Sequence, residues 1–253
     1  MERITSAKNP LIQHVRHLLS SRAYREECGE FAAEGWKLLD EALRWYPQFT
    51  AVVVTENAAL PALPPQTRVA CVPETLMQSL SAMRTPQGVV FALKLPQTRE
   101  PELHPGMLLL DRIQDPGNLG TIFRTAEGAG VDGIIMSSDT VDIYNPKTVR
   151  STMGSLYRMP FFYEKDLKGV VERIKEKKVS VYAAHLKGKH AYYLEDYRRG
   201  CAFLIGNEGN GLTDELAALA DTYIRIPMEG QVESLNAAIA AAVLMYEVKR
   251  QRD

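Results

Sequence analysis

The chain has 253 residues, of which 45% are hydrophobic and 24% charged, a balance typical of a soluble globular protein with one large domain or two of moderate size. Its three cysteines, Cys28, Cys71 and Cys201, are widely spaced and form no CxxC pair, which argues against a disulfide framework and against a cysteine zinc site. A formal net charge of −1 excludes a uniformly basic nucleic-acid binder but allows a local basic patch.

Neither a secretory signal nor a membrane span is expected. The opening residues, MERITSAKNP, lack the apolar core of a signal peptide. The longest apolar stretch, residues 237–246, has only about half the length that crossing a bilayer requires. Together with the unpaired cysteines, these features predict a cytoplasmic protein with no membrane partner.

The first part of the chain is predicted to form a small α/β unit. Apolar residues at helical spacing predict an amphipathic helix over residues 10–21 and a second helix over residues 30–45. Strands are expected over residues 51–55, 68–72 and 88–93, with a helix over residues 73–81. The unit ends at about residue 95. Residues 96–105 (PQTREPELHP) contain three prolines and predict a linker.

The first 25 residues are basic. Their cations are Arg3, Lys8, Arg16, Arg22 and Arg25, against the single acid Glu2. His14 and His17 lie in the same stretch, three residues apart on the polar side of the predicted helix, and are interpreted as part of a solvated, partly basic face rather than as metal ligands.

From residue 106 onward, strands are predicted to alternate with helices. Expected strands cover residues 107–111, 131–137, 179–185, 202–206 and 223–226. Expected helices cover residues 119–129, 145–155, 165–177, 214–220 and 235–250. This alternation predicts a parallel sheet with helices on both faces, in which ligands bind beyond the carboxyl ends of the strands. The last helix is rich in alanine, which indicates close packing against another helix of this chain or of a second subunit.

Three loops at predicted strand ends carry the candidate chemistry: residues 115–125, 205–212 and 226–236. In the first, Asn118 suits a helix N-cap, and Arg124 is either a solvated residue or a ligand for phosphate. In the second, three glycines surround Glu208, a carboxylate that suits a hydroxyl, an amino group or a cation better than a phosphate. In the third, Ser234 is a natural N-cap for the last helix, which would place Asn236 in its first turn.

Taken together, these loops resemble the motifs of the SpoU (TrmH-like) family of RNA methyltransferases. The similar segments are DRIQDPGNLGTIFRTAEGAG, LIGNEGNGL and IRIPMEGQVESLNAAIAAAVLMYE, in the order that the family has them. The stretch SAKNPLIQHVRHLLSSRAYREECGEFAAEGWKLLDEAL is similar to the substrate-binding domain that many members carry. The resemblance therefore covers nearly the whole chain and divides it into an RNA-binding domain (1–95), a linker (96–105) and a catalytic domain (106–253).

The resemblance implies a function and a set of site residues. It implies transfer of a methyl group from S-adenosylmethionine to a ribose 2′-hydroxyl of RNA, by a homodimer with a C-terminal trefoil knot and without a metal. The implied catalytic positions are Asn118, Arg124, Glu208, Ser234 and Asn236. The implied cofactor positions are Gly206, Asn207, Ile226, Met228 and Leu235. In the RNA-binding domain, Lys8, Arg16, Arg22 and Arg25 are expected to contact phosphates.

Three questions stay open at the level of sequence. Arg124 is either the general base, as often proposed for the family, or a ligand that orients the phosphate beside the target ribose, because arginine side chains stay protonated at physiological pH. The RNA is expected to be ribosomal, with transfer RNA as the alternative. Two rival functions are a nucleotide-dependent oxidoreductase, for which the glycine fingerprint is missing, and a non-catalytic RNA-binding or ribosome-assembly factor.

Overall fold

A computed structural model describes residues 1–81, 83–96 and 106–253. The chain divides into two compact units, one formed by Met1–Gln97 with Asp142–Tyr157 and the other by Thr98–Val141 with Arg158–Asp253. Most of the predicted linker, residues 97–105, lies outside the described residues. The sequence prediction assigned everything from residue 106 to the catalytic domain, whereas the segment Asp142–Tyr157 is compact with the first unit.

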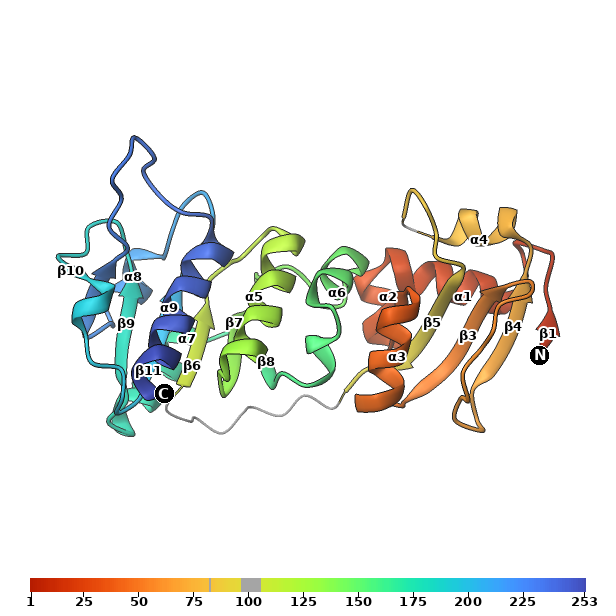
Figure 1. Cartoon of the computed structure of the whole chain (residues 1–253), viewed down its shortest axis with the longest axis horizontal. Coiled ribbons are helices and arrows are strands. Elements are labelled where there is room, and N and C mark those ends of the chain that lie inside the picture. Colours follow the sequence, from red (N-terminus) through yellow and green to blue (C-terminus); the bar gives the residue numbers. More distant parts are fainter. Residues whose placement is uncertain (82, 97–105) are drawn as a thin grey trace. The chain divides into compact units, whose positions relative to one another are not determined.

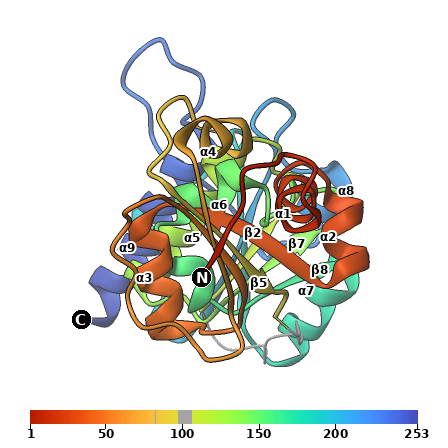
Figure 2. The same ribbon diagram turned by 90° about the vertical axis from the view of Figure 1, so that its right-hand side faces the viewer.

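The first unit is a mixed five-stranded sheet with helices on both faces. Its strands, in the order β1-β4-β3-β5-β2, are β1 (Glu2–Arg3), β4 (Arg68–Val72), β3 (Phe49–Thr55), β5 (Val89–Lys94) and β2 (Glu30–Glu34). Its helices are α1 (Pro10–Ser20), α2 (Arg22–Cys28), α3 (Trp36–Trp45), α4 (Glu74–Leu80) and α6 (Pro146–Thr152), followed by the 3₁₀ turn η1 (Ser155–Tyr157). Figure 2 shows α1 and α2 on one side of this sheet and α3 on the other.

The prediction of one helix over residues 30–45 is wrong in its first third. Residues Glu30–Glu34 form the edge strand β2, which pairs antiparallel with β5, and α3 begins only at Trp36. Gly35, with φ of 109°, separates the two elements in a backbone conformation that favours glycine. Pairing with β5 outweighs the weak strand propensity of this alanine-containing segment, because strand formation depends strongly on tertiary context. The short elements β1 and α2 were also missed.

The second unit is built on a parallel sheet, as predicted. Among the described residues its seven strands are ordered β10-β12-β9-β11-β6-β7-β8, and every neighbouring pair is parallel. The strands are β6 (Gly106–Leu110), β7 (Gly133–Ser137), β8 (Phe161–Glu164), β9 (Ser180–Ala184), β10 (His190–Ala191), β11 (Cys201–Ile205) and β12 (Thr222–Arg225). β8 and β10 were not predicted; both are edge strands of this sheet.

Helices cover both faces of the parallel sheet (Figure 1). They are α5 (Pro116–Ala129), α7 (Leu167–Glu176), α8 (Asp214–Ala217) and α9 (Ala237–Arg252), with the 3₁₀ turn η2 (Tyr192–Leu194) after β10. Alternate strand residues such as Leu109 and Leu204 are buried against α7 and α8, and α5 packs against α9. The prediction that the alanine-rich last helix packs on another helix is confirmed within this chain.

Among the described residues, no helix is long and apolar enough to cross a membrane.

Candidate active site at the carboxyl edge of the parallel sheet

The first loop turns sharply from β6 into α5. Arg112, just after β6, has φ of 56°, a left-handed conformation that non-glycine residues seldom adopt. Asp115 caps α5, because its Oδ1 accepts a hydrogen bond from the Asn118 N–H at 2.8 Å, and Pro116 occupies the first turn. The prediction that Asn118 is the cap is therefore wrong: α5 begins at residue 116, and the amide side chain of Asn118 is left for other contacts.

The second loop closes on itself after β11. The backbones of Asn207 and Gly211 exchange two hydrogen bonds of 3.0 and 2.9 Å. The Asn207 side chain accepts from the N–H groups of Gly209 and Asn210 and donates to the carbonyl of Arg112 at 2.8 Å. A Cβ at Gly206 would lie 2.2 Å from the Gly211 carbonyl carbon, so only glycine fits there. The Asn207 side chain thus organises the loop.

Glu208 joins the second loop to the start of α5. One carboxylate oxygen accepts from the Asn118 Nδ2 at 2.8 Å and from the Asp115 N–H at 3.2 Å. The other accepts from the Gln114 N–H at 3.2 Å. Burial favours a higher pKa for Glu208, but the hydrogen bonds from Asn118 and from backbone N–H groups outweigh it, and the pKa of this carboxyl is lowered. Glu208 is therefore an ionised acceptor that fixes Asn118.

The third loop reaches the same place through Asn236. Its Oδ1 accepts hydrogen bonds from the N–H groups of Ala238 and Ile239, so Asn236 is the N-cap of α9. Its Nδ2 donates to the Asn118 Oδ1 at 2.8 Å. The prediction of Ser234 as the cap is wrong: α9 begins two residues later than expected, and Ser234 is exposed. Asn118 thus bridges Glu208 and Asn236 across three loops.

Arg124 and Ser234 are not joined to this array. Arg124 is exposed on α5 and has no hydrogen bond or ion pair to another described residue. Because it lies six residues after Asn118, it is about 240° further around the helix axis. Ser234 likewise has no hydrogen bond within the described part of the chain. Of the five predicted catalytic residues, the structure brings together Asn118, Glu208 and Asn236.

The third loop offers unused backbone groups beside exposed apolar side chains. The backbone of residues 227–235 forms no hydrogen bond to another described residue. Met228 and Val232 are 36% and 63% exposed, whereas Ile226 and Leu235 are half-buried. Free N–H and C=O groups next to apolar surface suit a ligand with both a polar and an apolar part.

The cations predicted to bind RNA differ in exposure. Lys8 is exposed, Arg16 is half-buried with its Nη2 3.4 Å from the Ser79 hydroxyl, and exposed Arg22 pairs with Glu26. The Arg25 side chain is only 5% exposed. It donates to Asp142 at 2.6 and 3.1 Å and to the Leu18 carbonyl at 2.6 Å. The prediction that Arg25 contacts RNA is corrected, because its guanidinium is buried and paired.

The two histidines also differ from each other. His14 is half-buried, and its ring nitrogens lie 2.9 Å from the Tyr24 hydroxyl and 2.9 Å from a Glu30 carboxylate oxygen. The prediction of a solvated, partly basic face therefore holds for His17, which is exposed, but not for His14. No group of three or more potential metal ligands occurs among the described residues.

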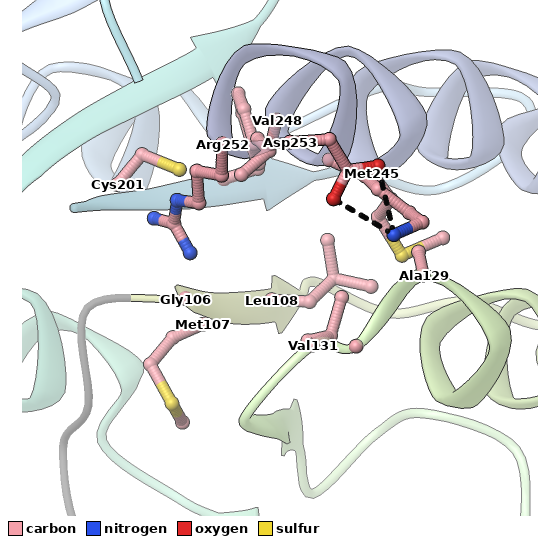
Figure 3. A pocket seen from close by; sticks show the side chains of 13 residues that line it. Gly106, Met107, Leu108, Ala129, Val131, Cys201, Met245, Val248, Arg252 and Asp253 are labelled. Atoms are coloured by element: carbon pink, nitrogen blue, oxygen red, sulfur yellow. Dashed lines mark hydrogen bonds and ion pairs between the residues drawn. The ribbon is translucent and has the colours of Figure 1, made fainter. Parts of the chain in front are cut away.

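A cavity of about 130 Å³ lies at the opposite end of the parallel sheet (Figure 3). Gly106 and Cys201, at the starts of β6 and β11, line it together with residues of α9. Its polar side chains are engaged: Lys249 pairs with Asp253, and Arg252 donates to the Tyr197 carbonyl. Burial raises the pKa of the Cys201 thiol to about 12, which favours the protonated thiol at neutral pH. This cavity is separate from the candidate site.

Sequence reasoning missed the residues that support the three loops. The buried carboxylate of Asp111 accepts from the Thr213 N–H at 2.9 Å, which ties the end of β6 to the residues after the second loop. Gln114 donates to the carbonyls of Asp139 and Arg112. The carboxylate after an apolar strand was a visible signal for Asp111. The left-handed backbone of Arg112 has no signal in residue type.

Solved structures that are similar over nearly the whole chain include RNA methyltransferases. An S-adenosylmethionine-bound rRNA methyltransferase from Sinorhizobium meliloti is 33% identical, with a TM-score of 0.85 over 98% of this chain and 97% of that one. The S-adenosylmethionine complex of the SpoU methyltransferase AviRb from Streptomyces viridochromogenes is 27% identical, with a TM-score of 0.85 over 97% and 98%. Fold and site thus define the class: an RNA methyltransferase.

The chain belongs to the SpoU rRNA methylase family, whose model matches residues 105–246. The model of the MRM3-like substrate binding domain matches residues 9–91. A 23S rRNA guanosine 2′-O-methyltransferase of Bacillus subtilis (RlmP) is 32% identical to this chain over 98% of its length and 100% of the relative's length. The resemblance inferred from the three loops and from the N-terminal stretch is confirmed.

Proposed function

We propose that the protein transfers a methyl group from S-adenosylmethionine to a ribose 2′-hydroxyl of ribosomal RNA. One observation carries this proposal: Asn118, Glu208 and Asn236, from three loops up to 118 residues apart, form a continuous hydrogen-bonded array at the carboxyl edge of the sheet. Full-length similarity to a 23S rRNA 2′-O-methyltransferase supports ribosomal RNA as the substrate class.

The third loop fits S-adenosylmethionine. The free backbone groups of residues 227–235 suit the amino, carboxylate and adenine edges of the cofactor, and the exposed side chains of Met228 and Val232 supply apolar contacts. Gly206 lets the second loop close tightly beside it. Ile226 and Leu235 flank the same loop. When bound, the cofactor supplies a methyl group already activated on a sulfonium sulfur.

The residues of the chain would act mainly by alignment. Glu208 holds the Asn118 amide in one orientation, and Asn236 holds it from the other side, so the three loops keep a fixed relative position. A fixed pocket that aligns the hydroxyl with the methyl group can contribute roughly 7–11 kcal/mol. The free guanidinium of Arg124 suits the phosphate beside the target ribose, and exposed Ser234 suits a hydroxyl of the substrate.

Methyl transfer to deproteinised ribosomal RNA tests this function. With S-adenosylmethionine labelled in its methyl group, we expect label in alkali-resistant dinucleotides, because a 2′-O-methyl group blocks cleavage at that ribose.

Arg124→Ala should lower the rate by at least about 100-fold without changing the melting temperature, since Arg124 has no partner within the described residues. Thr125→Ala, one residue further along α5, is the control. Label confined to the bases would refute the proposal.

We propose that the first unit contacts RNA through the predicted cations other than Arg25, whose side chain is buried. The exposed or half-buried cations Lys8, Arg16 and Arg22 remain candidates for phosphate binding. Replacing all three with glutamate should weaken RNA binding and flatten its salt dependence, while affinity for S-adenosylmethionine stays the same. Unchanged RNA affinity in an anisotropy titration at fixed salt would show that these three cations do not bind RNA.

We also propose that the protein is a homodimer whose subunits meet through α5 and α9. We further propose that its C-terminal segment forms a knot and that the protein acts in the cytoplasm. The apolar side chains of Ile239 and Tyr246 are each 50% exposed on α9 and suit a partner helix. Ile239→Glu with Tyr246→Glu should give a monomer by light scattering; a wild-type monomer would refute the dimer. A continuous experimental backbone trace tests the knot, and cell fractionation tests the location.

A further inference from the structure

A second exposed surface lies on the outer edge of the parallel sheet, beside β10 and η2. We propose that this edge surface, formed by Lys187, Lys189, Tyr193, Leu194 and Arg199, binds a single-stranded stretch of the RNA substrate. The inference rests on the proposed RNA methylation and adds a contact region in the catalytic unit that none of the three motif loops contains.

The edge surface exposes large apolar side chains. Tyr193 and Leu194, both in η2, are 52% and 72% exposed. Tyr193 lies edge-on to Tyr192, with ring centroids 5.3 Å apart. Covering neighbouring exposed apolar and aromatic side chains with another molecule removes their surface from water, which is favourable. Such groups therefore mark interaction sites more often than isolated exposed apolar residues do.

The backbone beneath these side chains is firmly held. Tyr197 is fully buried, and its hydroxyl donates to the Tyr192 carbonyl at 2.6 Å. Gln251 of α9 accepts from the Tyr197 N–H at 2.8 Å and donates to the Glu195 carbonyl at 2.9 Å. The exposed side chains therefore stand on a fixed support, which lowers the entropy lost when a ligand binds them.

The two lysines of the edge surface lie on either side of Gly188, whose backbone position is also fixed. Gly188 lies so close to β12 that a Cβ there would be 2.7 Å from the Ile224 carbonyl carbon. The Gly188 N–H donates to the His185 carbonyl at 2.9 Å. Lys187 and Lys189, on either side of Gly188, are exposed. Their positions on the sheet edge are thus set by backbone packing.

The charges of this edge are unbalanced toward positive. The two acids that follow η2 in the chain are both paired, Glu195 with His190 at 2.9 Å and Asp196 with Arg198 at 2.8 Å. Within the described residues, Lys187 and Lys189 have no carboxylate partner, and Arg199 adds a further positive charge near Asp196. Unpaired cations beside an exposed aromatic ring match the two needs of single-stranded RNA, which are phosphate neutralisation and base stacking. A second copy of this chain on the same surface would bring like charges together.

The edge surface begins at the carboxyl ends of the strands, where the candidate active site also lies. Lys187 follows β9, and Ala183 near the end of β9 pairs in register with Leu204 of β11, which pairs with Leu109 of β6. The carboxyl ends of these parallel strands therefore lie side by side. A strand of RNA that leaves the site across β9 would meet the edge surface.

Binding of a short fluorescent single-stranded RNA of mixed sequence, measured with the full-length protein at several salt concentrations, tests the inference. Lys187→Glu with Lys189→Glu should weaken binding and make the salt slope shallower by about 1.4. Tyr193→Ala should raise the Kd about fivefold or more, and Tyr193→Phe should restore it because the ring is kept. The control is Lys168→Glu with Lys175→Glu on α7, which changes the charge equally.

Methyl transfer to deproteinised ribosomal RNA provides the second readout. We expect the KM for RNA to rise with the Kd in the Lys187 and Lys189 variant, with kcat at saturating RNA unchanged. If the wild type methylates RNA but the edge variants bind and turn over like it, the edge surface inference fails and the proposed function stands. If the edge variants change oligomeric state instead, the surface is a subunit contact and the inference also fails. A wild type that transfers no methyl group to RNA would overturn the proposed function itself.

Discussion

The carboxyl edge of the parallel sheet and the basic α1–α2 region show two different relations between sequence and surface. At the carboxyl edge, Asn118, Glu208 and Asn236 meet although they are far apart in the chain. In α1–α2, residues that are close in the chain have different environments: Arg22 is exposed, while Arg25 is buried and paired with Asp142. Strand-end position is thus a better guide to a shared site than charge within one segment.

The largest effect is expected where a charge is buried. Arg25→Ala leaves the carboxylate of Asp142, which is only 13% exposed, without its ion-pair partner and should destabilise the first unit by about 3–5 kcal/mol. Arg68→Ala, which removes an exposed ion pair with Glu2, should cost less than about 1 kcal/mol. Urea unfolding of both variants measures the difference. Equal stabilities would show that Arg25 is not a structural residue.

Gly206→Ala should cost about 1–3 kcal/mol, because the added Cβ would overlap the backbone of Gly211 and Leu212. The loop must open to accept it, so affinity for S-adenosylmethionine should fall as well. Gly209→Ala is the matched control, since its Cβ would meet only the Asn207 Oδ1 at an ordinary 3.6 Å. Urea unfolding measures the loss of stability, and calorimetric titration with the cofactor measures the loss of affinity. A Gly206→Ala variant that matches Gly209→Ala in both would contradict the tight-loop interpretation.

Asn118→Asp should slow methyl transfer about tenfold at neutral pH. The substitution keeps the shape of the side chain but replaces the amide that donates to Glu208 with a second carboxylate, and like charges this close disfavour joint ionisation. Lowering the pH should recover part of the lost rate as the pair takes up a proton. A pH–rate profile parallel to that of the wild type would refute the contact.

The smallest expected effect is the pH dependence that Glu208 gives to stability. Because its pKa is lowered in the folded protein, its hydrogen bonds stabilise the fold fully above the ordinary value of about 4.5. This contribution is lost as the pH falls through the lowered pKa. Glu208 is largely exposed, so we expect less than about 1 kcal/mol. Glu208→Gln should remove this part of the acid dependence in urea unfolding at pH 7 and in acid.

Much of the architecture followed from patterns that repeat over several residues. Continuous apolar runs such as residues 107–111, in alternation with predicted helices, predicted the parallel sheet. The order of the three loops predicted which strand ends would carry the site. The segment 30–34 was mispredicted because its strand depends on pairing with β5, a contact that lies about 60 residues away in the chain and that local spacing does not encode.

The sequence predicted which residues would form the candidate site, but it did not predict their contacts. Residue types named Asn118 and Ser234 as caps, whereas Asp115 and Asn236 perform that role. A cap depends on where the helix begins, and sequence patterns locate helix ends only within a few residues. The burial of Arg25 was equally hidden, because its partner Asp142 lies 117 residues away.

A double-mutant cycle of Asn118→Ala and Asn236→Ala on kcat/KM for methyl transfer tests most directly whether the three loops work as one unit. Because the two side chains share a hydrogen bond and one of them is fixed by Glu208, we expect a coupling free energy of about 0.5–3 kcal/mol. Strictly additive losses, with each residue acting independently of the other, would contradict it.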